Sequence, residues 1–582
     1  MTRSTAAASS DPLPSSDAGG VPPLAAGPRA LALLSTWGLL FLAAPGVLTP
    51  AGLWPVALVA LVPWALWNAR PGPRAFLVEW CVAGLGSAAL CAWSAYVWWV
   101  TLLFIALVPG LYHALSGVVL RRLAVRYPLS VAAPAAWVLF EVPRCVIDPP
   151  FAYGWMRLGT FAHDMPGLAG SARVIGVFGL SFVLASFAGG LAGLVLRRPR
   201  GFLLGFVPLI VASVLASSIP APETVDGPRV LLIQPGIPQE RKQEGMEPAE
   251  LFASGRALTM RGLQELRARG EPEPDLIAWG ETMLPVPAME VGLEDALASG
   301  IESPGWTGLS ITPALVQWAR QREQAWVGGA LFGEDSFDRL IPEGGSFLAG
   351  CETFGVQDGW IRRFNGVVLW DASGQRAGLA AKVHLVPGAE SLAGLERLAW
   401  VRSSAQAVAN YIPDLAAFER TSVLTLDARD GRASWRFGVT VCFDNVYDDV
   451  YTEPARRGPL DFHLVCSNEA WYRTSFELDQ MMAFSRLIAL QTGRSLVRAT
   501  NAGVTTVLAP DGREVARLRV GGQDRMVEGT LAVTVPVPAE GARMPPYPRF
   551  EPLWLGLWIV GPLLLLLAAT LGRRPRVRPK PV

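Results

Sequence analysis

The residue types that could do chemistry in this chain gather around one cysteine. Cys442 follows Trp435–Val441, where apolar side chains alternate, and it precedes the turn-like Phe443–Asn445. Alternation at every second position predicts a strand with one buried face. A thiol at the end of a buried strand is held rigidly and is still accessible to a substrate. Cys442 is therefore a candidate nucleophile.

A carboxylate and a lysine precede this cysteine, each beside an extended apolar run. Glu281 ends Ile277–Glu281, and Lys382 begins Lys382–Pro387. The thiolate is the reactive form of a cysteine, and a carboxylate whose pKa is raised by burial could take its proton. The lysine would lower the thiol pKa and, with the Phe443 backbone N–H, stabilise an oxyanion. The resulting thioester would react readily with amines, which suits acyl transfer from an ester to an amine.

Each of these residues also has an ordinary structural explanation. A cysteine at a strand end is usually a small core side chain, and a single glutamate or lysine after a strand is usually solvated. The order of the three, each at an extended apolar run, favours the catalytic interpretation. Cys351 and Cys466 are competing nucleophiles, and Cys466 ranks second because it lies at a strand end but matches no motif.

Other kinds of site find little support in the sequence. The six cysteines show no CxxC spacing, the four histidines show no HxxxH or HExxH, and no GxGxxG or Walker sequence is present. We therefore expect no disulfide framework, no metal and no cofactor. The net charge of +1 gives no indication of a nucleic-acid partner.

The composition indicates a membrane protein with a separate globular part. Hydrophobic residues make up 51% of the 582-residue chain and charged residues only 17%, and acids are nearly absent from residues 30–120. Apolar stretches on the order of 20 residues are long enough to cross a bilayer. Eight such stretches lie at 30–48, 51–69, 75–98, 101–120, 129–146, 171–196, 202–219 and 551–571.

The positions of the arginines predict the orientation of these spans. Basic clusters follow the second, fourth, sixth and eighth spans, and basic residues concentrate on the cytoplasmic side of a membrane. Because the clusters follow every even-numbered span, they place both ends of the chain in the cytoplasm and residues 222–547 outside. This agreement would be lost if 129–146 were re-entrant.

Within the span at 129–146, Glu141 and Arg144 lie at i, i+3 on one helix face. They predict either a structural ion pair or a role in binding lipid headgroups.

We predict four parts along the chain. They are a disordered cytoplasmic tail at 1–28, seven transmembrane helices in 29–221, a globular domain at 222–547, and an eighth helix with a basic tail at 548–582. In the globular domain, predicted helices alternate with short apolar segments that predict strands, which indicates an α/β fold. The helices are expected at 248–269, 312–323 and 477–493, and strands at, among others, 276–279 and 325–331.

The whole chain resembles the apolipoprotein N-acyltransferase family of the nitrilase superfamily. The most specific stretches are His384–Pro387, Ser467–Tyr472 and Arg498–Thr505. The resemblance implies a nitrilase-like αββα sandwich on a multi-span α-helical membrane domain. It implies Glu281 as general base, Lys382 as oxyanion stabiliser and Cys442 as nucleophile, with Glu390 as the carboxylate that orients the lysine.

The resemblance also implies substrates and a location. In this family a phospholipid gives its acyl chain to the cysteine, and the α-amino group of a diacylglyceryl-cysteine lipoprotein takes it. The expected protein is a monomer of the cytoplasmic (inner) membrane, with its catalytic domain on the periplasmic or outer face. A membrane-tethered amidase that transfers to water, and a non-catalytic membrane scaffold with a degenerate nitrilase fold, remain alternatives.

The chain departs from the family pattern beside each triad residue. Gly280 stands where the family has proline, Phe443 and Asp444 where it has tyrosine and glutamate, and Gly388-Ala389 where it has Phe-Gly. Segments 286–308 and 333–362 look extended. These departures put the exact substrate in doubt more than the chemistry.

The predicted topology can be tested with reporter fusions. Fusions after residues 225 and 580 should report an outside and a cytoplasmic location respectively, because the arginine clusters favour that orientation. The reverse result would remove the lipoprotein interpretation.

Lipid tails leave a bilayer only at a cost of roughly 0.8 kcal/mol per CH₂. We therefore expect apolar loop residues to dip towards the membrane, with Trp400 and Tyr411 as candidates and burial in the domain core as the alternative.

Overall fold

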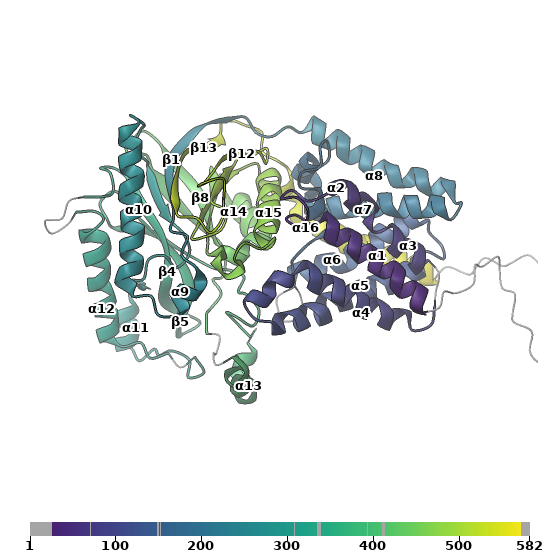
Figure 1. Ribbon diagram of the computed structural model, residues 1–582, viewed down its shortest axis with the longest axis horizontal. Coiled ribbons are helices and arrows are strands. Elements are labelled where there is room, and N and C mark those ends of the chain that lie inside the picture. The colour runs from purple at the N-terminus through teal and green to yellow at the C-terminus, as the bar shows by residue number, and fades with distance from the viewer. Residues whose placement is uncertain are drawn as a thin grey trace, which may run out of the picture.

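The computed structural model describes residues 26–69, 72–147, 151, 153–307, 309–333, 339–392, 394–409 and 414–571. A helical region and an α/β region lie end to end along the longest axis (Figure 1). The chain builds most of the helical region first, then the α/β region, and returns to the helical region for its last helix.

Nine helices make up the helical region within the described residues. They are α1 (Ala26–Ala43), α2 (Trp54–Ala60), α3 (Val62–Asn68), α4 (Ala75–Leu90), α5 (Val100–Leu123), α6 (Leu129–Val146), α7 (Ala172–Val195), α8 (Pro199–Ser218) and α16 (Tyr547–Leu571). Five of them, α5 to α8 and α16, are long and apolar enough to cross a membrane. The second predicted span consists of two short helices, α2 and α3, which meet just before Pro63, a residue without an N–H. The apolar helices at the first three predicted spans are shorter than these five, so the count of eight spans stays a prediction.

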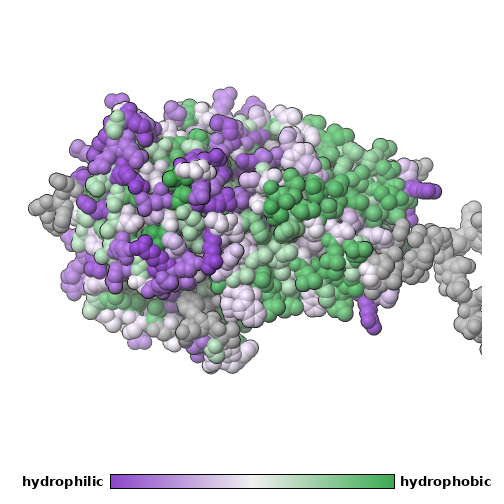
Figure 2. Space-filling view, in the orientation of Figure 1, coloured by the Kyte–Doolittle hydropathy of each residue, from purple (hydrophilic) through white to green (hydrophobic). Residues whose placement is uncertain are grey.

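The outer surface of the helical region is apolar. Figure 2 shows hydrophobic residues over the helical half and hydrophilic ones over the α/β half. On α8 and α16, Leu203 and Leu553 are each 69% exposed. A continuous apolar surface of this kind is what a bilayer covers, so the chain is a multi-span membrane protein.

Two sheets form the centre of the α/β region. The first has the order β13-β1-β2-β4-β5-β6, with β3 on β4, and the second has the order β12-β11-β10-β9-β8-β7. The first sheet comprises β1 (Thr224–Gln234), β2 (Leu276–Trp279), β3 (Ala288–Met289), β4 (Ser346–Gln357), β5 (Trp360–Trp370), β6 (Arg376–Ala381) and β13 (Gly529–Pro538). The second comprises β7 (Ser422–Asp427), β8 (Ser434–Val441), β9 (Phe462–Ser467), β10 (Ser495–Thr500), β11 (Thr506–Leu508) and β12 (Glu514–Arg517).

Alternation along the strands builds two cores and makes the region an αββα sandwich. In β1, Val230 and Leu232 face the second sheet, whereas Leu231 and Ile233 pack under helix α10. Helices α10 and α12 cover the outer face of the first sheet, and α14 and α15 cover the second (Figure 1). These helices are α10 (Pro248–Ala268), α12 (Pro313–Glu323), α14 (Asp449–Arg457) and α15 (Glu477–Thr492). The remaining short helices are α9 (Gln239–Gln243), α11 (Leu293–Ala298) and α13 (Ala399–Ala409).

The strand predicted at 325–331 is wrong. Gln324–Gly329 continues α12 as a π-helical turn. Trp326 stacks on Phe252 of α10 with ring centroids 4.7 Å apart, and the Arg322 guanidinium lies 4.5 Å from its ring. The short apolar run therefore packs a helix against a helix, which its sequence cannot distinguish from a strand.

Buried polar contacts join the two regions through α15. Gln480 Oε1 accepts hydrogen bonds from Trp93 Nε1 at 3.1 Å and from Trp155 Nε1 at 2.6 Å, and both tryptophans belong to the helical region. Arg157 of the helical region pairs with Asp448 at 2.7 Å. Because these groups are buried, their bonds fix how the two regions meet.

Glu141 and Arg144 do not form the ion pair that their spacing suggested. Glu141 Oε1 accepts a bond from Leu158 N at 2.6 Å, and Arg144 Nη1 donates to Tyr153 O and Trp155 O at 2.7 and 2.8 Å. Both side chains instead hold the extended segment that follows α6. That segment carries Trp155 and Arg157 to the α/β region.

Removing the arginine of the buried pair should destabilise the protein. We expect Arg157→Met to lower the free energy of unfolding by about 3 kcal/mol, because Asp448 would stay buried without its cation. The midpoint of denaturant unfolding in detergent, followed by tryptophan fluorescence, measures the change. Arg432→Gln is the control, since the Arg432 side chain is 87% exposed and lies 3.7 Å from Asp430. Equal midpoints for the two variants would contradict the structural role of the pair.

Candidate active site

The thiol of Cys442 stands at a sharp turn between β8 and a 3-10 helix, Cys442–Val446. Its φ of 50° lies in the left-handed region, which costs a residue with a Cβ roughly 1–2 kcal/mol. The Asp444 carboxylate holds the turn by accepting a bond from Val441 N at 3.0 Å. Cys442 is 6% exposed, so the turn holds its thiol almost completely buried.

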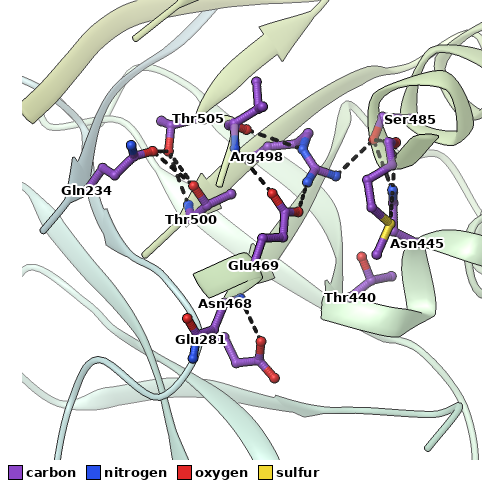
Figure 3. Close-up of polar contacts among 12 residues, drawn as sticks. Gln234, Glu281, Thr440, Asn445, Asn468, Glu469, Ser485, Arg498, Thr500 and Thr505 are labelled. Atoms are coloured by element: carbon purple, nitrogen blue, oxygen red, sulfur yellow. Dashed lines mark hydrogen bonds and ion pairs between the residues drawn. The ribbon is translucent and has the colours of Figure 1, made fainter. Parts of the chain in front are cut away.

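Glu281 lies beside this thiol at the end of β2. Its Oε1 accepts a bond from Asn365 Nδ2 at 2.6 Å. Its Oε2 accepts one from Asn468 N at 2.7 Å (Figure 3). The Cys442 thiol lies close enough for this carboxylate to raise its pKa. Burial raises the pKa of Glu281, although Lys382 opposes the shift. A carboxylate with a raised pKa beside a thiol can act as a general base.

Gly280 permits the approach of the two sheets at this point. A Cβ on Gly280 would lie 2.9 Å from Asn501 N of the second sheet, which is closer than real contacts allow. A glycine in place of the family's proline therefore fits the close packing beside Glu281.

Lys382 follows β6 and is held by a carboxylate. Its Nζ lies 2.8 Å from Glu390 Oε1, and Glu390 Oε2 accepts a bond from Val386 N at 2.8 Å. Burial acts to lower the pKa of Lys382, but Glu390, Cys442 and Glu281 together raise it above its ordinary value. The ammonium therefore stays charged and is aimed by Glu390.

Lys382 acts to lower the pKa of the Cys442 thiol, as expected, but two other effects oppose it. Burial and the neighbouring Glu281 carboxylate raise the pKa of Cys442 well above its usual range. Lys382 acts in the lowering direction but does not outweigh them. A base beside the thiol would therefore help to form the reactive thiolate.

Asp444 connects the turn at Cys442 to the segment that begins at Lys382. Besides Val441 N, its oxygens accept bonds from His384 N at 2.7 Å and Val383 N at 3.2 Å. It is fully buried, and burial raises the pKa of Asp444 to about 6. The shorter side chain at this position therefore still reaches both segments that carry reactive groups.

Phe443 belongs to an aromatic cluster between the two regions. Its ring lies nearly parallel to Trp155 at 6.2 Å and to Tyr153 at 6.3 Å, and edge-on to Tyr447 at 5.4 Å. Tyr153 and Trp155 come from the helical region, so that region packs against the residue next to Cys442. The ring needs no hydroxyl to make these contacts, which accounts for phenylalanine in place of the family's tyrosine.

Sequence reasoning missed the polar network behind the three residues. Asn365 and Asn468 bind Glu281 directly. Glu469, next to Asn468, pairs with Arg498 in full burial (Figure 3). Arg498 Nη1 donates to Ser485 Oγ at 2.9 Å. The sequence did indicate Asn468, Glu469 and Arg498, because they lie in the motif stretches Ser467–Tyr472 and Arg498–Thr505. It did not indicate what role their polar side chains have.

The competing cysteines lie outside this arrangement. Cys351 and Cys466 are fully buried, and burial raises the pKa of both thiols, that of Cys351 to about 12. Cys466 Sγ lies 3.7 Å from Trp279 O, beneath the site. Neither thiol could be presented to a substrate without opening the core.

Trp400 lies on α13 and is 70% exposed, so burial in the domain core is not its explanation. Tyr411 lies outside the described residues. Among the residues that the structure describes, no three His, Cys, Asp or Glu side chains stand together as metal ligands.

Comparison with known proteins places this geometry in a family. The carbon-nitrogen hydrolase family model matches residues 232–537, which include Glu281, Lys382 and Cys442, and the apolipoprotein N-acyltransferase N-terminal domain matches residues 27–190. The chain belongs to the apolipoprotein N-acyltransferase family. It is therefore an enzyme of the nitrilase superfamily with a membrane-spanning helical region.

Curated relatives match over most of their length. The chain is 28% identical to an apolipoprotein N-acyltransferase of Azotobacter vinelandii over 91% of this chain and 93% of that protein. The corresponding enzyme of Sinorhizobium fredii is 28% identical over 73% and 72%, and that of Shewanella oneidensis 26% over 84% and 87%. Among solved structures, an amidase from Nesterenkonia sp. matches with 16% identity and a TM-score of 0.32, covering 54% of this chain and 92% of that one.

The Asp444 carboxyl should make stability depend on pH in a defined window. The pKa of Asp444 is 3.8 ordinarily and about 6 in the folded protein. Between these two pH values the folded protein keeps the carboxyl protonated, whereas the unfolded chain has lost that proton. The contribution of Asp444 to stability therefore falls as pH rises from about 4 to about 6, by about 3 kcal/mol. Asp444→Asn cannot titrate and should lack this fall.

Denaturant unfolding of both proteins in detergent between pH 4 and 7 measures the difference. Asp427→Asn, which removes an exposed carboxylate on β7, is the control. Parallel pH curves for the wild type and Asp444→Asn would show that Asp444 does not titrate in this range.

Proposed function

We propose that this protein transfers a fatty acyl chain from a phospholipid, through a thioester on Cys442, to the N-terminal amine of a diacylglyceryl-cysteine lipoprotein. Glu281 is the general base, Lys382 the oxyanion stabiliser and Glu390 its orienting partner. The observation that carries the proposal is that Glu281, Lys382 and Cys442 are all buried close enough to act on one another electrostatically, with Glu390 holding the lysine ammonium at 2.8 Å.

The first step acylates the enzyme. Glu281 accepts the thiol proton as Cys442 Sγ attacks the ester carbonyl carbon of the phospholipid. The carbonyl oxygen becomes an oxyanion that Lys382 Nζ and the Phe443 N–H stabilise, since the first N–H groups of a helix have no partner within it. The ester C–O bond breaks, and Glu281 returns the proton to the leaving oxygen, which releases a lysophospholipid.

The second step passes the acyl chain to an amine. The neutral amine attacks the thioester carbonyl carbon, Glu281 accepts a proton from the amine, and the same donors stabilise the second oxyanion. The C–S bond breaks, the sulfur recovers its proton from Glu281, and the product is an amide. One base thus serves both steps, because its pKa is raised towards the working range.

The surroundings of the site support a lipid substrate over a small soluble amide. Tyr153 and Trp155, which flank Phe443, come from the helical region whose outer surface is apolar. Trp93 of the same region packs edge-on against Tyr472, with ring centroids 4.9 Å apart. Moving an acyl chain from a bilayer to a distant aqueous site would cost roughly 0.8 kcal/mol per CH₂. A reactive cysteine beside the membrane helices avoids that cost.

The proposal is tested by supplying the substrates one at a time to the full-length protein in detergent. Phospholipid alone should add one fatty acyl chain to the intact mass of the protein, and hydroxylamine should remove it. A diacylated lipopeptide added afterwards should become triacylated. Cys442→Ala and Cys442→Ser should lower product formation at least roughly 10⁴-fold, because neither side chain forms a thiolate.

Cys466→Ala is the matched control and should keep its activity, since that thiol lies in the core. Product formed in a single turnover without any acyl-enzyme would contradict the thioester. Release of free fatty acid with no triacylated peptide would instead favour the membrane-tethered hydrolase. Full activity of Cys442→Ala would disprove the assignment of the nucleophile.

A further inference from the structure

Ser485 of α15 joins two parts of the active site that are far apart in the sequence. It is fully buried where α15 packs on the second sheet. A buried serine in a helix often bonds only the carbonyl four residues before it, and Ser485 Oγ does lie 2.9 Å from Met481 O. Groups from two other segments of the chain also bind this oxygen. The ordinary explanation therefore accounts for only part of its contacts.

These contacts use the whole bonding capacity of the Ser485 hydroxyl. It donates its one proton to Met481 O, the nearer of the two acceptors within reach. It accepts from Arg498 Nη1 at 2.9 Å and from Asn445 Nδ2 at 3.0 Å (Figure 3). A serine hydroxyl has one proton and two lone pairs, so all three are occupied. An alanine at this position could make none of these bonds.

On one side, the contacts lead to the segment that holds Glu281. Arg498 forms a fully buried ion pair with Glu469 (Figure 3). The other oxygen of Glu469 accepts a bond from Val504 N at 3.1 Å. Glu469 follows Asn468, whose N–H donates to Glu281 Oε2 at 2.7 Å. A shift of Arg498 would therefore move the backbone that carries a donor to Glu281.

On the other side, the contacts hold the turn that carries Cys442. Asn445 lies three residues after Cys442 in the same 3-10 helix and is fully buried. Its Oδ1 accepts a bond from Tyr451 Oη at 2.9 Å, and that hydroxyl lies 3.1 Å from Thr440 Oγ1, two residues before Cys442. The turn is thus fixed before and after the cysteine, whose φ of 50° persists only where the surroundings enforce it.

The buried ion pair indicates what these contacts are for. Replacing a buried ion pair by apolar side chains of similar volume is often neutral or stabilising, so the pair of Glu469 and Arg498 is weak evidence for a role in stability. A fully satisfied buried polar network instead makes its surroundings rigid and specifies a single arrangement. Here the arrangement that it specifies is that of the two segments carrying Glu281 and Cys442.

We propose that Ser485 is a positioning residue whose hydroxyl fixes the Glu281 carboxylate relative to the Cys442 thiol. It acts through Arg498 and Asn445 and is not itself a catalytic residue. The inference rests on the proposed roles of Glu281 as base and Cys442 as nucleophile. A base accepts a proton efficiently only within hydrogen-bond reach of it, so a small displacement lowers the rate of acylation more than it lowers the binding of a lipid.

Single-turnover acylation of the full-length protein in detergent tests this role. Phospholipid and p-nitrophenyl butyrate are supplied as separate acyl donors, and intact mass follows the acyl-enzyme. Ser485→Ala should lower the maximal rate constant of acylation about tenfold with both donors, because alignment of the base and the thiol is lost. The phospholipid concentration that gives half the maximal rate should stay unchanged, because the bonds of Ser485 go to protein groups behind the reacting residues.

Three further variants separate the hydroxyl from general damage to the fold. Ser485→Thr keeps a hydroxyl and should retain most of the rate. Ser495→Ala is the matched control, since Ser495 is a fully buried serine of β10 whose hydroxyl donates to Pro536 O, and it should acylate at the wild-type rate. Tyr451→Phe removes the hydroxyl between Asn445 and Thr440 and should slow acylation as Ser485→Ala does.

Unchanged rate constants in both Ser485→Ala and Tyr451→Phe would overturn the proposal. Equal losses in Ser485→Ala and Ser495→Ala would also overturn it, because they would show a general effect on the fold. A changed half-saturating concentration at an unchanged rate constant would place Ser485 in lipid binding instead. Absence of any acyl-enzyme in the wild type would contradict the proposed function and this inference with it. Acylation by p-nitrophenyl butyrate alone would contradict only the phospholipid donor.

Discussion

Three ionisable groups, Glu281, Lys382 and Cys442, are buried close together, and the cost of burying them governs the structure around them. A buried charge without a partner costs several kcal/mol. Lys382 is therefore matched by Glu390, and Glu281 receives hydrogen bonds from Asn365 and the Asn468 N–H. The donors to Glu281 are neutral amides, so the carboxylate is satisfied without being neutralised and its pKa stays raised by burial. The same buried environment keeps Lys382 charged and keeps Glu281 able to accept a proton.

The junction between the two regions places the turn at Cys442 against the helical region. The segment after α6 is tied down by Arg144 and Glu141, and it presents Trp155 to both Phe443 and Gln480. The reactive turn and the helical region thus share one aromatic cluster. A residue that departs from the family pattern, such as Phe443, is explained by these neighbours and needs no change of chemistry.

Much of this architecture could be predicted from local sequence, because it depends on periodicity and on motif order. Strand β2 and helix α15 lie where the alternation and the helical pattern predicted them, and the three reactive residues follow strand ends as expected. The π-helical turn after α12 and the partners of Glu141 and Arg144 were predicted wrongly, since both depend on what packs across from them. Asn365 could not be predicted as a partner of Glu281. The two residues are far apart in the sequence, and only the pairing of β2, β4 and β5 in one sheet brings them together.

The pairing of the first and last strands has a consequence for how the protein is made. Thr224 of β1 lies opposite Pro538 of β13, so the α/β region begins and ends at one place, between α8 and α16. Strand β13 forms the edge of the first sheet, and α16 packs on α5, α6 and α7. Both the sheet and the helical region therefore remain incomplete until the last part of the chain has been synthesised. Assembly of the membrane base and of the catalytic sandwich must finish together, which couples membrane insertion to the appearance of a competent site.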